Sequence, residues 1–249
     1  MTDELVKQGT TALATNATPS FVDAADRSGT EHIEQKDLQM PRLGLAQKMS
    51  PQIEETASEY IEDLKFGDMF NSLTGESYGR GPVDFMVIRA DRPRGIEFYP
   101  IDEGGGVKDM NVSRDDPRMQ FGPDGAKPTA TLFYDYIIAL VPSMELIALS
   151  LKGSGLKAAR QLNGLMKLRS GPVFAGLYEA SVVIKSNDKG TYAVFQIRNS
   201  PRHNGWAPDE ETYNWASGVF QNIAEKKITV DLEEAPLKPL TTSSDEIPF

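Results

Sequence analysis

The residues best suited to binding chemistry lie between positions 150 and 202. This stretch holds nine Lys and Arg against two Asp and Glu, a net charge of +7, in a 249-residue chain whose formal net charge is -10. Single-stranded nucleic acid is bound by cations that contact phosphates and by flat rings on which bases stack. The block supplies both, so it favours a polyanionic ligand. The alternative is a solvated surface whose charge is cancelled by neighbours in space.

Alternation along the predicted strand at 190–198 separates a buried face from an outward face. The buried face is expected to carry Thr191, Ala193, Phe195 and Ile197. The outward face carries Tyr192, Val194, Gln196 and Arg198. Tyr192 and Arg198 are therefore the leading contact candidates. The other candidates for nucleic-acid contacts are Tyr134, Tyr136, Lys152, Lys157, Arg160, Lys167, Arg169, Lys185, Arg202 and Trp206. Tyrosines on strands more commonly pack with a wet hydroxyl, which is the competing interpretation.

Other chemistries find less support in the residue types. The chain has no cysteine and only His32 and His203, which argues against disulfides, thiolate metal sites and a His-rich zinc site. Asp84, Glu97 and Asp102, with Lys108 downstream, could serve a nuclease that uses magnesium. Their spacing matches no recognised motif, so the sequence favours a protein that is not an enzyme and has no cofactor or resident metal.

The periodicity predicts a mainly β, α+β fold for residues 80–230. Two predicted hairpins flank a helix at 154–168; their strands cover 131–141 with 144–151, and 174–185 with 191–198. Further strands are expected at 83–89 and 96–101, and a terminal helix at 209–226. A helix between the third and fourth strands is typical of an oligonucleotide-binding (OB) barrel. The predicted body is therefore an OB-fold-like barrel that binds nucleic acid.

Three other segments complete the predicted organisation. Residues 1–37 resemble a disordered arm, and residues 38–79 a peripheral helical module in which Ser50 and Pro51 open a helix. Residues 231–249 form an acidic C-terminal interaction tail. We find neither a basic, apolar secretory signal nor a run of about 20 apolar residues, which predicts a cytosolic protein that does not contact membranes. An oligomer is compatible with the sequence.

The tail carries the only family resemblance. Its ending, Asp245-Glu246-Ile247-Pro248-Phe249, resembles the C-terminal peptide of bacterial single-stranded DNA-binding proteins, Asp-Asp-Asp-Ile-Pro-Phe. The resemblance implies that the tail docks replication and repair proteins, with Pro248 and Phe249 as anchors beside Ile247, and with Asp245 and Glu246 as the steering acids. The tail departs from the family at Ser243 and Ser244, where more Asp is usual, and it lacks the long Gly/Gln-rich linker. The match covers only the last five or six residues.

Together these features predict a single-stranded DNA-binding protein of phage or bacterial type. It would bind DNA without strong sequence preference during replication, recombination or repair, and would recruit partners through the tail. One alternative is an adaptor or assembly protein whose body binds protein and whose tail is its functional motif. The nuclease is the other alternative.

Overall fold

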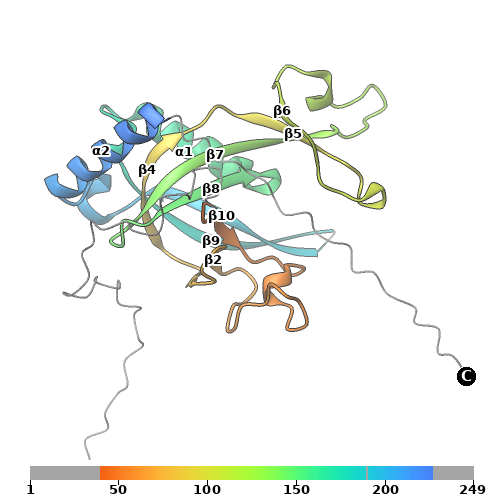
Figure 1. Cartoon of the computed structure of the whole chain (residues 1–249), viewed down its shortest axis with the longest axis horizontal. Coiled ribbons are helices and arrows are strands. Elements are labelled where there is room, and N and C mark those ends of the chain that lie inside the picture. The colour runs from red at the N-terminus through yellow and green to blue at the C-terminus, as the bar shows by residue number, and fades with distance from the viewer. Residues whose placement is uncertain (1–39, 189, 227–249) are drawn as a thin grey trace, which may run out of the picture. The chain divides into compact units, whose positions relative to one another are not determined.

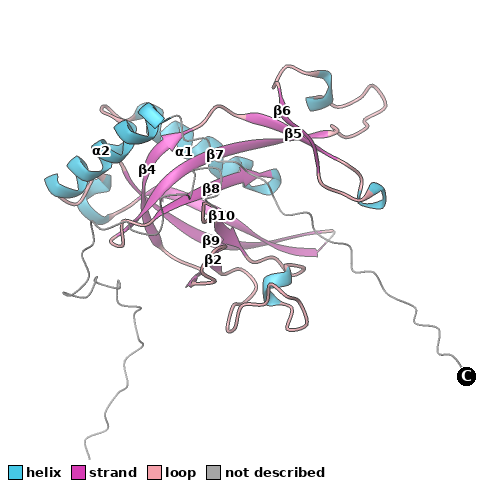
Figure 2. Ribbon diagram, viewed as in Figure 1, coloured by secondary structure: helices cyan, strands magenta, loops and turns pink. Residues whose placement is uncertain are grey.

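A seven-stranded antiparallel sheet forms most of the structure, a computed structural model that describes residues 40–188 and 190–226. Strand order is β10-β9-β4-β7-β5-β6, and β8 pairs with the other edge of β7 (Figures 1 and 2). The strands are β4 Val83–Ala90, β5 Arg94–Phe98, β6 Val107–Val112, β7 Ala130–Val141, β8 Leu146–Lys152, β9 Leu177–Asn187 and β10 Gly190–Asn199. The predicted arm at 1–37 and the tail at 231–249 lie outside the described residues.

Strand β7 is the centre of this sheet because it pairs along its whole length. On one flank it pairs with β4 and then β5, with Asp84 opposite Val141 and Glu97 opposite Ala130. On the other flank it pairs with β8, the returning strand of the predicted hairpin. Its long apolar run is explained by burial on both faces of the sheet.

Helix α1, Leu156–Leu168, packs against one face of the seven-stranded sheet, which we call the inner face. The helix contacts both β8 and β10. In a flat sheet these two edge strands would lie about 19 Å apart, four intervals of about 4.8 Å. A helix is only about 10 Å wide, so the sheet must bend around α1 for the helix to reach both edges. The buried core there includes Ala159 and Leu162 of α1 and Ile197 of β10.

Tyr134 and Tyr136 belong to this core, which corrects their predicted exposure. They share a face of β7 as expected, but α1 covers that face, and their exposed fractions are 6% and 2%. The Tyr136 hydroxyl donates to Asn163 Oδ1 at 2.9 Å. Neither ring offers a face on which a base can stack.

The second helix, α2 Glu210–Lys226, covers the outer face. Ala216 and Ile223 are buried against Met86 and Ile137, and Phe174 packs against Tyr213 with ring centroids 5.5 Å apart. Asp209 Oδ1 accepts a hydrogen bond from the Thr212 backbone N–H at 2.7 Å, as expected of a helix cap. Neither described helix is long and apolar enough to cross a membrane.

Residues 43–79 form a small sheet instead of the expected helical module. Its strands are β1 Leu43–Leu45, β2 Met69–Asn71 and β3 Ser77–Gly79, in the order β1-β2-β3. Ser50 and Pro51 open only a 3₁₀ turn, Pro51–Ile53. Strands of three residues are too short to show an alternating pattern, which explains why the sequence did not reveal them.

The segment just before and after β1 covers both edges of the large sheet. At β8, the Ala148 backbone N–H donates to the Pro41 carbonyl at 2.8 Å. At β10, the Gln47 side-chain amide both donates to and accepts from the backbone of Ala193, each at 3.0 Å. The described strands therefore do not close into a barrel: β8 and β10 remain unpaired with each other. The fold is mainly β with two helices, as predicted, but an OB barrel is not confirmed.

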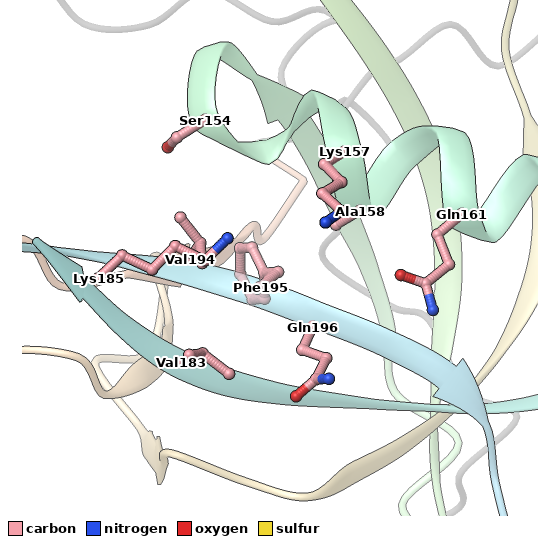
Figure 3. Close-up of a pocket in the computed structure, with 9 residues that line it drawn as sticks. All are labelled: Ser154, Lys157, Ala158, Gln161, Val183, Lys185, Val194, Phe195 and Gln196. Carbon is pink, nitrogen blue, oxygen red and sulfur yellow. The ribbon is translucent and has the colours of Figure 1, made fainter. Parts of the chain in front are cut away.

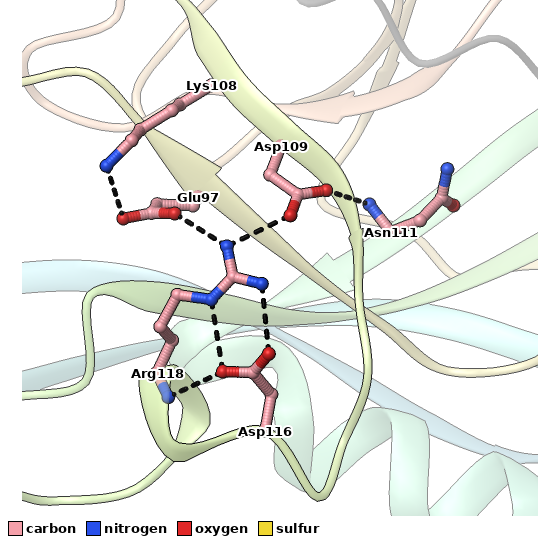
Figure 4. Close-up of polar contacts among 6 residues, drawn as sticks. All are labelled: Glu97, Lys108, Asp109, Asn111, Asp116 and Arg118. Carbon is pink, nitrogen blue, oxygen red and sulfur yellow. Dashed lines mark hydrogen bonds and ion pairs between the residues drawn. The ribbon is translucent and has the colours of Figure 1, made fainter.

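Strands β5 and β6 extend to the side of the sheet away from α2 (Figure 1). Arg118 secures this region, since its guanidinium contacts Asp116, Glu97 and Asp109, all at 2.9 Å (Figure 4). Lys108 also pairs with Glu97 at 3.0 Å. Hydrogen bonds from Arg118 lower the pKa of Glu97 and of Asp116. The pKa of Asp109 is lowered most by the hydrogen bond from the Asn111 backbone N–H, and next by the hydrogen bond from Arg118.

Replacing Gln47 with Ala should destabilise the protein. The Gln47→Ala variant leaves the backbone N–H and carbonyl of Ala193 unpaired at a position only 1% exposed. We expect the free energy of unfolding in urea to fall by about 1 to 3 kcal/mol. The exposed Gln120→Ala change is the matched control; equal stability of the two variants would contradict the edge-covering role of Gln47.

Arg118 should make stability depend on pH in the acid range. The pKa values of Glu97, Asp109 and Asp116 lie below their ordinary values of 4.5, 3.8 and 3.8. Their stabilising contribution is therefore present above those ordinary values and is lost as the pH falls through the lowered ones. Urea midpoints at pH 7 and pH 3 should differ less in Arg118→Met than in the wild type. An identical difference would show that Arg118 does not hold these carboxylates.

Candidate nucleic-acid interface

A groove separates the start of α1 from the β9–β10 hairpin (Figure 3). Its cavity measures about 180 Å³. Lys157 and Gln161 reach into it from α1, opposite Lys185 and Gln196 on the strands. The remaining lining residues are Ser154, Ala158, Val183, Val194 and Phe195. The groove thus combines cations from two walls with an apolar floor.

The local structure explains how the two lysines come together. Gly153 has a left-handed φ of 52°, which turns the chain from β8 into the 3₁₀ turn Gly153–Gly155 and then into α1. Lys157 therefore lies in the first turn of the helix. Lys185 lies on β9 as the cross-strand partner of Tyr192 on β10. Of the predicted contacts, Lys157 and Lys185 are brought into one site, with Tyr192 beside Lys185.

The exposed face of α1 continues this basic surface. Lys157, Arg160, Gln161 and Lys167 are exposed, whereas Ala158, Ala159 and Leu162 are buried. This division follows the predicted apolar stripe of the helix. The elements that carry the basic block, namely α1, β9 and β10, are therefore neighbours in the fold.

Strand β10 shows the predicted alternation with two differences. Ala193 and Ile197 are buried as expected, and Gln196 and Arg198 are exposed. Val194, expected to face outward, is only 6% exposed and lines the groove. Phe195, expected in the core, is half-buried, packs against the core and also lines the groove.

Arg169 and Trp206 form a stacked pair beyond the C-terminal end of α1. The Arg169 guanidinium lies 4.5 Å from the Trp206 ring and 5.2 Å from the Tyr178 ring. It also donates to the Gly205 carbonyl and, at 2.8 Å, to Asn199 Oδ1. Arg169 is therefore occupied by structural contacts, while Trp206 remains 43% exposed. Burial raises the pKa of Tyr178, and Arg169 partly offsets that effect.

Arg198 and Arg202 are each held by a buried carboxylate. Arg198 Nε contacts Glu179 Oε1 at 2.6 Å, and Arg202 Nη1 contacts Asp84 Oδ2 at 3.1 Å. Both arginine side chains remain about two-thirds exposed. Lys152 lies elsewhere, over the rings of Phe133 and Phe98 at 4.9 and 5.8 Å.

Sequence reasoning missed the groove residues that are not cationic. The alternation of β10 predicts an outward Gln196 but gives it no contact, and it predicts Phe195 in the core. Gln161 gave no signal, because a glutamine on an exposed helix face is ordinary. The tail residues Asp245, Glu246, Ile247, Pro248 and Phe249 lie outside the described residues.

The carboxylates considered as a nuclease centre do not form one site. Asp84 and Glu97 pair with opposite ends of β7, eleven residues apart, which corresponds to about 35 Å. Asp84 contacts Arg202, and Glu97 contacts Arg118 and Lys108. Within residues 40–188 and 190–226, no group of three or more His, Asp or Glu is placed to hold a metal ion.

Comparisons with known proteins identify a phage family. No curated protein and no solved structure matches the chain. The model of the family described as Pam3 phage gp34-like protein matches residues 8–229, far more than half of the 249 residues. The chain that carries this groove therefore belongs to the Pam3 phage gp34-like protein family.

Proposed function

We propose that this protein binds single-stranded DNA through the groove between α1 and the β9–β10 hairpin. It acts without catalysis and without strong sequence preference, in phage DNA replication, recombination or repair in the host cytosol. The acidic tail then recruits replication or repair proteins. One observation carries the proposal: Lys157 and Lys185 face the same groove from opposite walls.

The composition of the groove suits a single strand. Two lysines supply charge for phosphates, and phosphate contacts carry no direct sequence information. The apolar side chains of exposed Val183 and half-buried Phe195 can receive base faces that a duplex keeps stacked. Tyr192 is the cross-strand partner of Lys185, so a ring adjoins one of the groove cations. These features support strand binding with little selectivity among bases.

The placement of the positive charge supports the same proposal. A net charge of +7 falls on a contiguous block that folds into adjacent elements, while the whole chain carries -10. Acidic surfaces elsewhere would limit nonspecific attachment, and the basic face would attract a polyanion. Recruitment by the tail is supported by the resemblance of residues 245 to 249 to the docking peptide of bacterial single-stranded DNA-binding proteins.

Removing both groove lysines should weaken DNA binding. For Lys157→Gln with Lys185→Gln we expect the affinity for labelled oligo(dT) to fall roughly tenfold, about 1.4 kcal/mol. The slope of log affinity against log salt should also fall by about 1.4 in magnitude, about 0.7 per phosphate contact. Fluorescence anisotropy at several salt concentrations measures both quantities, with a matched duplex for comparison.

The control removes the same charge from another region. Arg114 and Lys127 are exposed in the segment between β6 and β7. The Arg114→Gln, Lys127→Gln double variant should retain nearly wild-type affinity. Equal losses in the two double variants would mean that net charge alone governs binding and would reject the groove. If the wild type binds neither oligo(dT) nor duplex, the adaptor alternative replaces DNA binding.

The acidic tail should compete with DNA for the basic groove. We expect a chain that ends at residue 240 to bind oligo(dT) a few-fold more tightly than the full chain at low salt. High salt should reduce the difference, because it screens the attraction between tail and groove. Full-length Asp245→Asn, Glu246→Gln is the companion variant, since it keeps Phe249 and loses the acids. Equal affinities of all three proteins at every salt concentration would remove the competition.

A further inference from the structure

The outer face of the sheet carries a row of charged residues across three strands. Arg198 on β10 is the register partner of Glu179 on β9, and Glu179 is the partner of Asp84 on β4. Arg202, from the 3₁₀ turn Arg202–Gly205 after β10, completes the row by contacting Asp84. The two carboxylate side chains are 4% and 5% exposed, whereas the two arginine side chains are 65% and 66% exposed.

Neutralising the carboxylates explains only part of this arrangement. Like charges on directly opposite strand residues repel, so buried Glu179 and Asp84 each require a cation. The other described arginines that pair with carboxylates are less exposed: Arg94 is 21%, Arg89 27%, Arg118 37% and Arg80 54% exposed. Arg118 also uses Nε, Nη1 and Nη2 on carboxylates.

Arg198 and Arg202 instead retain free donors. Each guanidinium offers five N–H groups in a planar fork. Among the described residues, Arg198 uses only Nε and Arg202 only Nη1. The remaining N–H groups belong to side chains that are about two-thirds exposed, and each guanidinium is held at one nitrogen by a buried carboxylate. A guanidinium held in this way loses less side-chain entropy when it binds a second acceptor.

The pair also continues the groove. Arg198 follows Gln196 by two residues on the same side of β10, a step of about 7 Å along the strand. A strand bound between Lys157 and Lys185 and running along β10 would reach Arg198 and Arg202 next. Guanidinium forks match phosphate oxygens, which they bind through two parallel hydrogen bonds.

We propose that Arg198 and Arg202 form a phosphate-binding pair at the end of the groove, and that buried Glu179 and Asp84 are its positioning residues. The ligand is a phosphate group of a single DNA strand, either an internal diester or a terminal 5′-phosphate. This inference rests on the proposed function and extends it to a second cationic site with preset geometry.

The decisive variants each remove one negative charge. If only net charge matters, DNA affinity should rise; if the carboxylates position the arginines, DNA affinity should fall. Glu179→Gln and Asp84→Asn each make the protein more positive by one, and bulk electrostatics would therefore tighten DNA binding. Loss of positioning should instead weaken binding of oligo(dT) roughly threefold to tenfold. The salt slope should fall by about 0.7 in magnitude with each variant, because one phosphate contact is lost. Arg198→Lys, which keeps the charge and loses the fork, should weaken binding similarly.

The matched control is Asp135→Asn, which alters a buried carboxylate paired with Arg94 elsewhere in the sheet. It should bind as tightly as the wild type or slightly more tightly. Thermal unfolding of every variant establishes that the fold is retained, and Arg198→Lys provides the test if a carboxylate variant fails to fold.

Two forms of oligo(dT), with a 5′-hydroxyl or a 5′-phosphate, distinguish the sources of the phosphate. Equal losses with both forms assign the pair to an internal diester, and a loss confined to the phosphorylated form assigns it to a strand end. The phosphate-binding pair would be overturned if Glu179→Gln, Asp84→Asn and Arg198→Lys bind as tightly as the wild type or more tightly while Lys157→Gln with Lys185→Gln is impaired. The proposed function would then still stand. A wild-type protein that binds neither form would overturn both.

Discussion

The packing of α1 across the inner face of the sheet is the constraint on which the rest of the structure depends. The helix contacts both β8 and β10, so the sheet has to bend around it. Tyr136, Leu162 and Ile197 meet in the resulting core, and the Tyr136 hydroxyl is satisfied by Asn163 of the helix. Because the inward face of α1 is fixed in this way, its basic face is presented beside β10. The groove is a consequence of this packing.

The open edges of the sheet impose a second constraint. A barrel would satisfy the backbone of β8 and β10 by pairing them, but here the segment around β1 covers part of each edge. At β10 a single side chain, Gln47, replaces a strand partner at Ala193. Beyond that point β10 carries the groove and then Arg198. Strand pairing at this edge would cover the surface that we assign to DNA.

Local patterns predicted both helices and most strands of the large sheet, but not β6 or the three short strands of the small sheet. Tertiary packing decided the rest. Pro142 marked the end of β7, and the apolar stripe of α1 and the turn before Gly190 identified the helix and the second hairpin. Period-two alternation correctly put Tyr134 and Tyr136 on one face, but α1 buries that face, which no local pattern reveals. The Glu179 and Asp84 contacts of Arg198 and Arg202 arise from the register of three strands. Sequence separation concealed these contacts.

Hydrogen–deuterium exchange with and without saturating oligo(dT) tests the central claim most directly, because it maps the strand on the intact protein. The account predicts slower exchange in peptides that cover 153–168 and 181–199, with little change in β5 and β6. Protection confined to β5, β6 or the small sheet, with α1 and the β9–β10 hairpin unchanged, would contradict it.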